Sequence, residues 1–77
     1  MTHHNNHPPP TAKTSIILPT YKERDNIVEL VQTIHRHLEP QAFNYEVVIV
    51  DDNSPDGTAD AVRVAFGDDP RVCLHVR

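Results

Sequence analysis

The chain has 77 residues, with 11 acidic and 7 basic side chains and a formal net charge of -4. This length allows one small domain, and the lack of a basic stripe excludes a nucleic-acid partner bound by phosphate neutralisation. Cys73 is the single cysteine, which excludes an internal disulfide and favours a reducing, cytosol-facing environment. No apolar run approaches the ~20 residues of a membrane helix, and the amino terminus lacks the apolar region of a signal peptide.

Residues 1–13, MTHHNNHPPPTAK, contain three histidines and three consecutive prolines but no periodic apolar pattern. We expect a disordered tail, because these residues offer nothing to bury against a core. His3, His4 and His7 can bind a divalent metal adventitiously, but a solvated polar tail is the simpler interpretation. The folded part is therefore predicted to comprise residues 14–77.

A short apolar run at residues 16–18, rich in β-branched side chains and followed by Pro19, predicts a buried strand. Residues 21–40 then show helical spacing, with Asp25 as the predicted N-cap and Pro40 as the predicted stop. The face expected to be buried carries Ile27, Val31, Ile34 and Leu38, with Leu30 beside it.

Residues 45–50, YEVVIV, predict a second strand that is apolar enough for both of its faces to be covered. The turn-forming segment DNSPDGT follows, and residues 58–66 predict a second helix that ends at Gly67. The inward side chains of this helix are expected to be Ala61, Val62, Ala65 and Phe66. A turn at residues 68–70 leads into a third predicted strand that begins at Arg71.

The predicted order is strand, helix, strand, helix, strand, which is typical of an α/β protein with parallel strands and right-handed crossovers. In such open sheets the ligand lies beyond the carboxyl ends of the strands. Two polar segments occupy that edge, PTYKE after the first strand and DDNSPDGT after the second. We therefore expect these two loops to lie next to each other.

The two loops lack the glycine-rich patterns GxGxxG and GxxxxGK[ST] that cradle phosphates. They offer instead an aromatic ring at Tyr21 and carboxylates at Glu23, Asp51 and Asp52. Carboxylates accept hydrogen bonds from the N–H groups of a base and the hydroxyls of a ribose, and an aromatic ring packs on a base. This set can therefore bind a nucleoside and leave the phosphates to a metal held elsewhere.

LPTYKERDNI followed by VIVDDNSPDGT resembles the start of the family 2, GT-A type inverting glycosyltransferases. Within that family the SPDGT segment is most similar to the dolichol-phosphate mannosyltransferase group, which uses polyprenyl-phosphate acceptors. The resemblance covers residues 14–77, and it implies the amino-terminal part of a Rossmann-like parallel sheet, cut short. The chain resembles roughly the first third of such an enzyme, so we expect it to be inactive alone and marginally stable.

The resemblance also implies a nucleotide-sugar pocket in this chain. It assigns to that pocket Pro19, Tyr21, Glu23, Val50, Asp51 and Asp52, with Asp52 accepting a hydrogen bond from the nucleobase. Lys22 departs from the family pattern, in which Asn is more usual, and it is expected to point away from the nucleotide.

Further expectations follow from the family rather than from the residues themselves. The substrates would be GDP-mannose and a polyprenyl phosphate, with Mg²⁺ or Mn²⁺ bound by a DxD motif that would lie beyond Arg77. The acceptor-binding residues would lie there too, so no catalytic residue is assigned in this chain. The setting would be the cytosolic face of the endoplasmic reticulum membrane, where the full-length protein would have a membrane-anchoring partner subunit.

Other interpretations stay open at this point. Acidic and hydroxyl side chains after a strand are also common in turns and at helix N-termini, and this is the preferred interpretation for Ser54 and Asp56. The acid pair in IVDD also occurs in phospho-accepting receiver domains, and a non-catalytic nucleotide-binding fragment is a third reading. His35 and His37 are expected to be solvated, and Cys73 is expected to be a small core residue.

Overall fold

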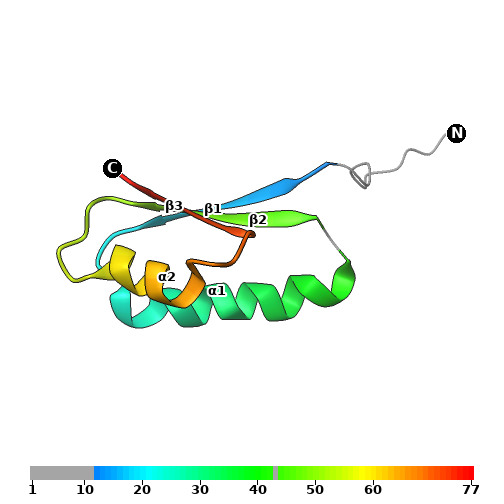
Figure 1. The fold of residues 1–77 in the computed structure, drawn as a ribbon, viewed down its shortest axis with the longest axis horizontal. Helices are drawn as coiled ribbons and strands as arrows, with labels where there is room; N and C mark the ends of the chain where they lie inside the picture. Colours follow the sequence, from blue (N-terminus) through cyan, green and yellow to red (C-terminus); the bar gives the residue numbers. More distant parts are fainter. Residues whose placement is uncertain (1–11, 43) are drawn as a thin grey trace, which may run out of the picture.

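The computed structural model describes residues 12–42 and 44–77, so residues 1–11 of the predicted tail, with its three histidines, lie outside it. Within the described residues, strands and helices alternate (Figure 1). Their order is β1 (Thr14–Thr20), α1 (Arg24–Leu38), a short 3₁₀ helix η1 (Glu39–Gln41), β2 (Tyr45–Asp51), α2 (Thr58–Phe66) and β3 (Val72–Val76). The predicted alternation of strands and helices is therefore confirmed.

The sheet is parallel throughout and its strands follow one another in the order β1-β2-β3. The β1–β2 register runs from Thr14 opposite Tyr45 to Thr20 opposite Asp51. The β2–β3 register ends with Asp51 opposite Val76. The last residues of the strands are thus aligned, which places the loops after β1 and β2 at the same edge of the sheet.

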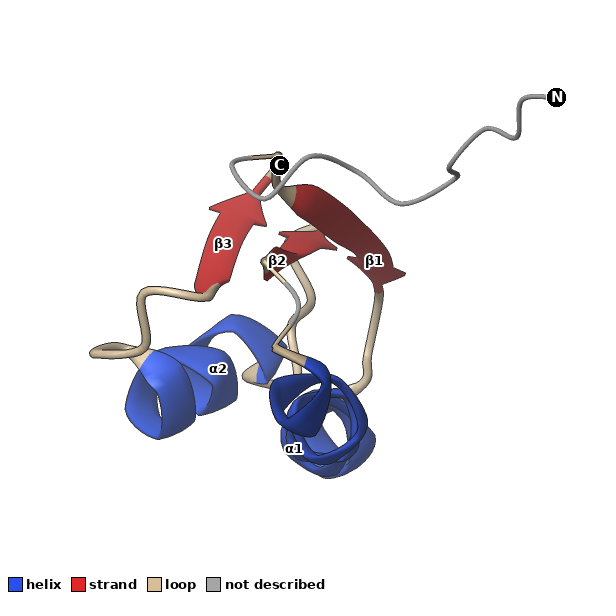
Figure 2. Ribbon diagram, turned by 90° about the vertical axis from the view of Figure 1, so that its right-hand side faces the viewer, coloured by secondary structure: helices blue, strands red, loops and turns tan. Residues whose placement is uncertain are grey.

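Both long helices pack on one face of the sheet, as Figure 2 shows. The core between the layers consists of Ile27, Val31, Tyr45, Val47, Ile49, Val62 and Phe66. Alternate residues of β2 therefore point into this core, and the intervening Val48 and Val50 are only half-buried. The expectation that both faces of β2 are covered is wrong for the described residues, because their helices cover one face only. On the opposite face Ile17 is 55% exposed.

The helix boundaries are close to the predicted ones, but the start of α1 is built differently. Glu23 occupies the N-cap position, and the predicted N-cap residue Asp25 lies exposed in the first helical turn. The Glu23 side chain makes no capping hydrogen bond, and the backbone N–H groups of Glu23 and Arg24 donate to Thr58 and Asp56. At the other end α1 stops at Leu38, and Pro40 lies in the 3₁₀ helix that follows.

Helix α2 buries a narrower stripe than the sequence predicted. Thr58, Val62 and Phe66 are buried at intervals of four residues, whereas Ala65 is exposed. The helix ends at Gly67, where an added Cβ would lie 2.6 Å from the carbonyl oxygen of Arg63. A glycine is therefore required here by the close approach of the backbone.

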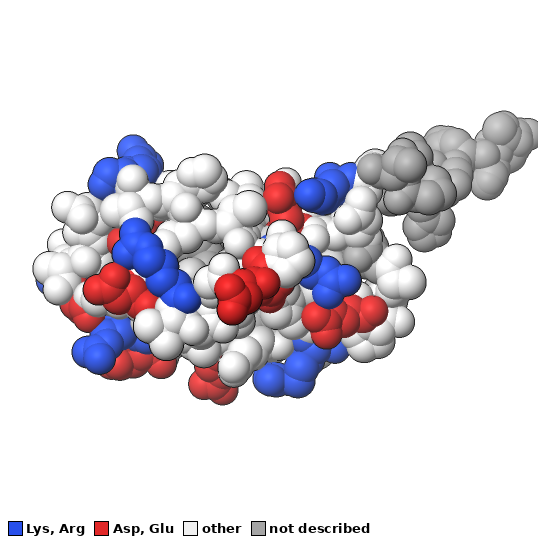
Figure 3. Space-filling view, in the orientation of Figure 1, with Lys and Arg blue, Asp and Glu red and all other residues white. Residues whose placement is uncertain are grey.

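The surface mixes both signs of charge. On the face seen in Figure 3, acidic and basic side chains are interspersed over the helices and the sheet edge. This face carries no basic stripe of the kind that nucleic-acid binding requires. No helix among the described residues is long and apolar enough to cross a membrane.

Candidate functional site

The loops after β1 and β2 lie side by side at the carboxyl edge of the sheet, as predicted. The backbone N–H of Asp52 donates to the carbonyl oxygen of Thr20 at 3.0 Å, which joins the ends of the two strands. We call residues 21–23 the first loop and residues 52–57 the second loop. Their backbone contains left-handed residues, with φ of 57° at Lys22, 56° at Asn53 and 89° at Gly57.

Asp51 is fully buried at the end of β2, and both of its carboxylate oxygens accept hydrogen bonds from other residues of the chain. One oxygen, Oδ1, accepts from the hydroxyls of Thr20 at 2.8 Å and Ser54 at 2.7 Å. The other, Oδ2, accepts from the backbone N–H of Ser54 at 2.8 Å. Burial alone would raise the pKa of Asp51, but the hydrogen bonds from Ser54 and Thr20 outweigh it and lower the pKa below its usual range. Asp51 therefore stays ionised and joins β1, β2 and the second loop.

Asp52 follows directly and has the opposite environment. Its side chain is exposed, and no group in residues 12–42 or 44–77 donates a hydrogen bond to its carboxylate. The backbone of Asp52 is nevertheless fixed, because its N–H is hydrogen-bonded to the carbonyl of Thr20 and the side chain of the preceding Asp51 is hydrogen-bonded to the Thr20 hydroxyl. A rigidly held carboxylate with free acceptor capacity is the feature expected of a group that binds N–H or O–H donors of a ligand.

The predicted residues of the first loop lie at the same edge. The ring of Tyr21 is 52% exposed, and the ammonium of Lys22 lies 5.5 Å from its centroid. Glu23 is half-buried, and its Oε1 accepts a long hydrogen bond from Asn26 at 3.4 Å. Both side chains therefore keep surface on which a ligand can pack.

The two remaining predicted residues are strand neighbours. Pro19 on β1 is the register partner of Val50 on β2, and both belong to the face of the sheet opposite the helices. Pro19 and Glu23 also line a hollow of about 170 Å³, whereas Asp51 lines a different one of about 210 Å³. The six predicted residues thus share one edge of the sheet, but neither of these two hollows is lined by all six.

Ser54 and Asp56, which the sequence assigned to a turn and a helix start, also act between the loops, and so does Thr58, the first residue of α2. The hydroxyls of Ser54 and Thr58 and the carboxylate of Asp56 accept hydrogen bonds from the backbone of residues 22–24. No signal in the sequence indicated this, because Asp25 offered a plausible N-cap close to the start of the helix.

The described residues do not provide a metal site. No group of three or more His, Cys, Asp or Glu side chains in residues 12–42 and 44–77 is placed so that it could hold a metal ion. Asp51 is already engaged in three hydrogen bonds. No chemical step is therefore assigned to a metal ion at these residues.

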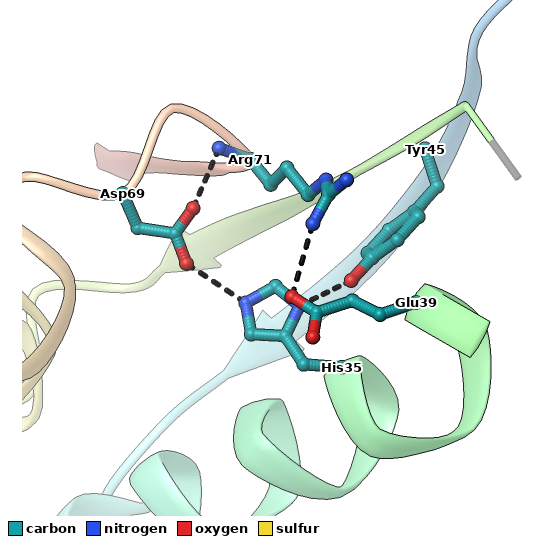
Figure 4. Close-up of polar contacts among 5 residues, drawn as sticks. All are labelled: His35, Glu39, Tyr45, Asp69 and Arg71. Carbon is teal, nitrogen blue, oxygen red and sulfur yellow. Dashed lines mark hydrogen bonds and ion pairs between the residues drawn. The ribbon is translucent and has the colours of Figure 1, made fainter. Parts of the chain in front are cut away.

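A second polar cluster lies at the other end of the sheet (Figure 4), where the sequence predicted solvated histidines. His35 is half-buried, and its Nδ1 is hydrogen-bonded to the hydroxyl of Tyr45, while its Nε2 lies 2.9 Å from Asp69. Arg71 bonds Asp69 through its backbone N–H and Glu39 through its guanidinium, which also lies 5.0 Å from the Tyr45 ring centroid. We call these five residues the His35 cluster.

The expectation that His35 is solvated is therefore wrong, whereas His37 is exposed as predicted. Helical spacing placed His35 near Arg36 on an outer face, but it gave no information on the Tyr45 hydroxyl, which is buried with its ring. Burial raises the pKa of Tyr45, with Arg71 acting in the opposite direction. A buried phenol needs a hydrogen-bond partner, and His35 provides it.

Comparison with known proteins identifies the class of the protein. The profile of glycosyl transferase family 2 matches residues 15–77. The chain therefore belongs to glycosyl transferase family 2, which decides against a receiver domain. Its strands and helices have the arrangement of the amino-terminal part of the GT-A fold.

Individual relatives are similar over most of this chain but over little of their own length. A dolichol-phosphate mannosyltransferase of Pyrococcus furiosus is 54% identical over 46 residues, which are 60% of this chain and 12% of the relative. A polyprenol monophosphomannose synthase of Mycolicibacterium smegmatis is 45% identical over 64 residues, 82% of this chain and 23% of the relative. The chain thus spans less than a quarter of the length of these relatives.

A solved structure is also similar. It is a mannosyltransferase from Pyrobaculum calidifontis in complex with GDP-Man and Mn²⁺, with a TM-score of 0.66 and 36% sequence identity. The similarity covers 92% of this chain and 21% of that protein.

Proposed function

We propose that the protein containing this chain transfers mannose from GDP-mannose to dolichyl or another polyprenyl phosphate, with inversion at the anomeric carbon. The names of the two relatives and the GDP-Man bound to the solved mannosyltransferase support this activity. Since the chain spans only part of each of these proteins, it is proposed to supply part of the nucleotide-sugar pocket and to be inactive alone.

The observation that carries the proposal is the contrast between the two adjacent acids. Asp51 is buried and hydrogen-bonded to Thr20 and Ser54. These contacts fix the position of the next residue, Asp52, whose side chain is exposed at the sheet edge. In the proposed pocket Asp52 accepts a hydrogen bond from an N–H of the guanine base, and Tyr21 packs on the nucleoside. Pro19, Glu23, Val50 and the backbone of Asp51 complete this part of the wall.

The proposed reaction makes modest demands on acid–base chemistry. A phosphate oxygen of the acceptor is already a competent nucleophile, so the main tasks are positioning and electrostatic stabilisation of the leaving diphosphate. A divalent cation, Mg²⁺ or Mn²⁺, would neutralise that diphosphate, and its ligands are expected outside the described residues. No side chain described here is assigned a proton transfer.

The proposed setting follows from the acceptor. A polyprenyl phosphate is a membrane lipid, so the complete protein would work at a membrane surface, and a membrane-anchoring partner subunit belongs to the proposal. In a eukaryotic cell this surface would be the cytosolic face of the endoplasmic reticulum, where the product would serve protein glycosylation and GPI-anchor synthesis.

The test is GDP binding by the natural full-length protein and its Asp52→Asn variant, measured by titration calorimetry. Losing the ionised acceptor leaves the base N–H poorly paired, a cost of about 1–3 kcal/mol or roughly a 5- to 150-fold loss of affinity. Asp68→Asn, which removes an exposed acid from the turn before β3, should leave the affinity unchanged.

Equal GDP affinity of wild type and Asp52→Asn would contradict the assignment of Asp52. The activity is tested separately, by following mannose from GDP-mannose into a polyprenyl phosphate. GDP binding without such transfer would favour the alternative of a non-catalytic nucleotide-binding protein.

A further inference from the structure

Three consecutive backbone amides, two in the first loop and one at the first residue of α1, find their acceptors in the second loop and at the start of α2. Lys22 N–H donates to the Ser54 hydroxyl at 2.8 Å, and Glu23 N–H donates to the Thr58 hydroxyl at 3.1 Å. Arg24 N–H donates to Asp56 Oδ2 at 3.3 Å. Amides in this position have no partner inside their own helix, so the acceptors that bind them fix where the helix and the first loop begin.

The acceptors are themselves oriented. The hydroxyl of Ser54 donates its proton to Asp51 Oδ1 at 2.7 Å, so its lone pairs remain for Lys22 N–H. The hydroxyl of Thr58 donates to Asp56 Oδ1 in the same way and accepts from Glu23 N–H. Each hydroxyl has one proton, and it donates that proton to Asp51 or Asp56, which lie in or beside the second loop. The lone pairs of both hydroxyl oxygens are therefore oriented toward the N–H groups of Lys22 and Glu23.

Thr58 itself is fully buried, so it has no surface for a ligand. Tyr21 and Glu23, which the proposed pocket uses, are adjacent to the amides that Ser54 and Thr58 hold. Lys22, which lies between them, has a left-handed backbone. This conformation is unfavourable for any residue other than glycine, so the surrounding structure must stabilise it.

We propose that Ser54, Asp56 and Thr58 are positioning residues of the nucleotide pocket: they fix the first loop, and with it Tyr21 and Glu23, relative to Asp52. This inference rests on the proposed function. It assigns to the SPDGT segment a role that a turn and a helix start alone do not require. Preorganisation of this kind improves affinity because the loop is already ordered before the ligand arrives.

The decisive variant is Thr58→Val in the natural full-length protein, because it keeps the shape of the side chain and removes the hydroxyl. GDP affinity should fall at least fivefold, and hydrogen exchange of the Glu23 amide should accelerate at least tenfold. Thr58→Ser restores the hydroxyl and should bring both values back to within twofold of wild type. Thr33→Val is the matched control, since it removes a hydroxyl that bonds only within and along α1.

The outcomes separate this inference from the assignment of Asp52. Faster Glu23 exchange in Thr58→Val with unchanged GDP affinity would overturn the positioning role, even if Asp52→Asn binds weakly. Weaker GDP binding by Thr58→Val beside an unaffected Asp52→Asn would support the positioning role and contradict the role of Asp52. Unchanged affinity in both variants would overturn both.

A folding defect in Thr58→Val would be recognised by circular dichroism, and Ser54→Ala then takes its place. That variant removes the acceptor of Lys22 N–H, and its GDP affinity should also fall at least fivefold. A Ser54→Ala protein that is folded and binds GDP as wild type does would overturn the proposal.

Discussion

The two ends of the sheet carry polar clusters of similar size that differ in how they use their hydrogen bonds. In the His35 cluster, both ring nitrogens of His35 are engaged within the protein, and so are the Tyr45 hydroxyl and the Asp69 carboxylate (Figure 4). At the carboxyl end, Asp51, Ser54 and Thr58 are engaged just as fully. At that end, however, the neighbouring side chains of Asp52 and Tyr21 are exposed and can contact a ligand.

This difference shows how a functional edge can be recognised in this fold. A cluster whose donors and acceptors are all paired internally can stabilise the protein but has nothing to offer a ligand. A cluster that is paired internally and also presents an exposed acceptor offers a rigid binding group. By this criterion we predict that the carboxyl end binds the ligand, whereas the His35 cluster connects α1, β2 and the turn before β3.

The largest effect is expected at the buried acid. Asp51→Ala removes the acceptor of three hydrogen bonds and leaves Thr20 and Ser54 without their shared partner. We expect a loss of about 3 kcal/mol in the free energy of unfolding, measured by urea denaturation. The neighbouring Asp52→Ala should change it by less than about 0.5 kcal/mol. Similar losses in the two variants would remove the distinction between the structural acid and the exposed one.

An intermediate effect is expected at the opposite end. His35→Ala leaves the buried Tyr45 hydroxyl without its His35 partner and removes one of the two hydrogen bonds of Asp69, which should destabilise the protein by about 2 kcal/mol. His37→Ala removes an exposed ring from the same helix and should cost about 0.5 kcal/mol or less. GDP affinity of the folded His35→Ala protein should equal that of wild type. A loss of GDP affinity there would mean that the two ends are coupled.

The smallest effect concerns the backbone of the second loop. Asn53 has a φ of 56°, a left-handed conformation that Asn tolerates better than Ala. Asn53→Ala should therefore lower the free energy of unfolding by about 0.5–1 kcal/mol, whereas Asn53→Gly should be close to neutral. An alanine variant as stable as wild type would show that this loop relaxes to another shape, which would weaken the case for a rigid carboxyl end.

The fold was largely predictable because its elements carry strong periodic signals. The apolar run of residues 45–50 and the helical spacing of Ile27 and Val31 place β2 and α1 correctly, and alternation then implies a parallel sheet. The edge that carries the loops follows from that topology. The family assignment depended on two motifs in order, each after a strand, and the profile match confirms it.

The sequence could not predict contacts made between distant segments. Asp25 looked like the N-cap of α1, but the amides of residues 22–24 that lead into the helix bond Ser54, Asp56 and Thr58, more than 30 residues away. His35 looked solvated because its partners, Tyr45 and Asp69, belong to other elements. Spacing along one helix reports which face a residue occupies, and it does not report what meets that face.

Lys22 has a left-handed backbone, a conformation that lysine disfavours. The family pattern that the first loop resembles has Asn at this position, and Asn tolerates positive φ better than Lys. Lys22 is exposed and its ammonium lies over Tyr21, and the expectation that it points away from the nucleotide stays a prediction. Whether the six pocket residues bind a nucleotide stays a prediction.

The hydrogen bond between Glu23 and Thr58 also has a consequence for the order in which the chain acquires its structure. The two residues are 35 positions apart, so during synthesis from the amino terminus α1 must emerge long before its first amides can be capped. Each strand pairs with the next one along the chain, so the sheet can grow in the order of translation. The first loop therefore reaches its final shape only after the second helix has begun.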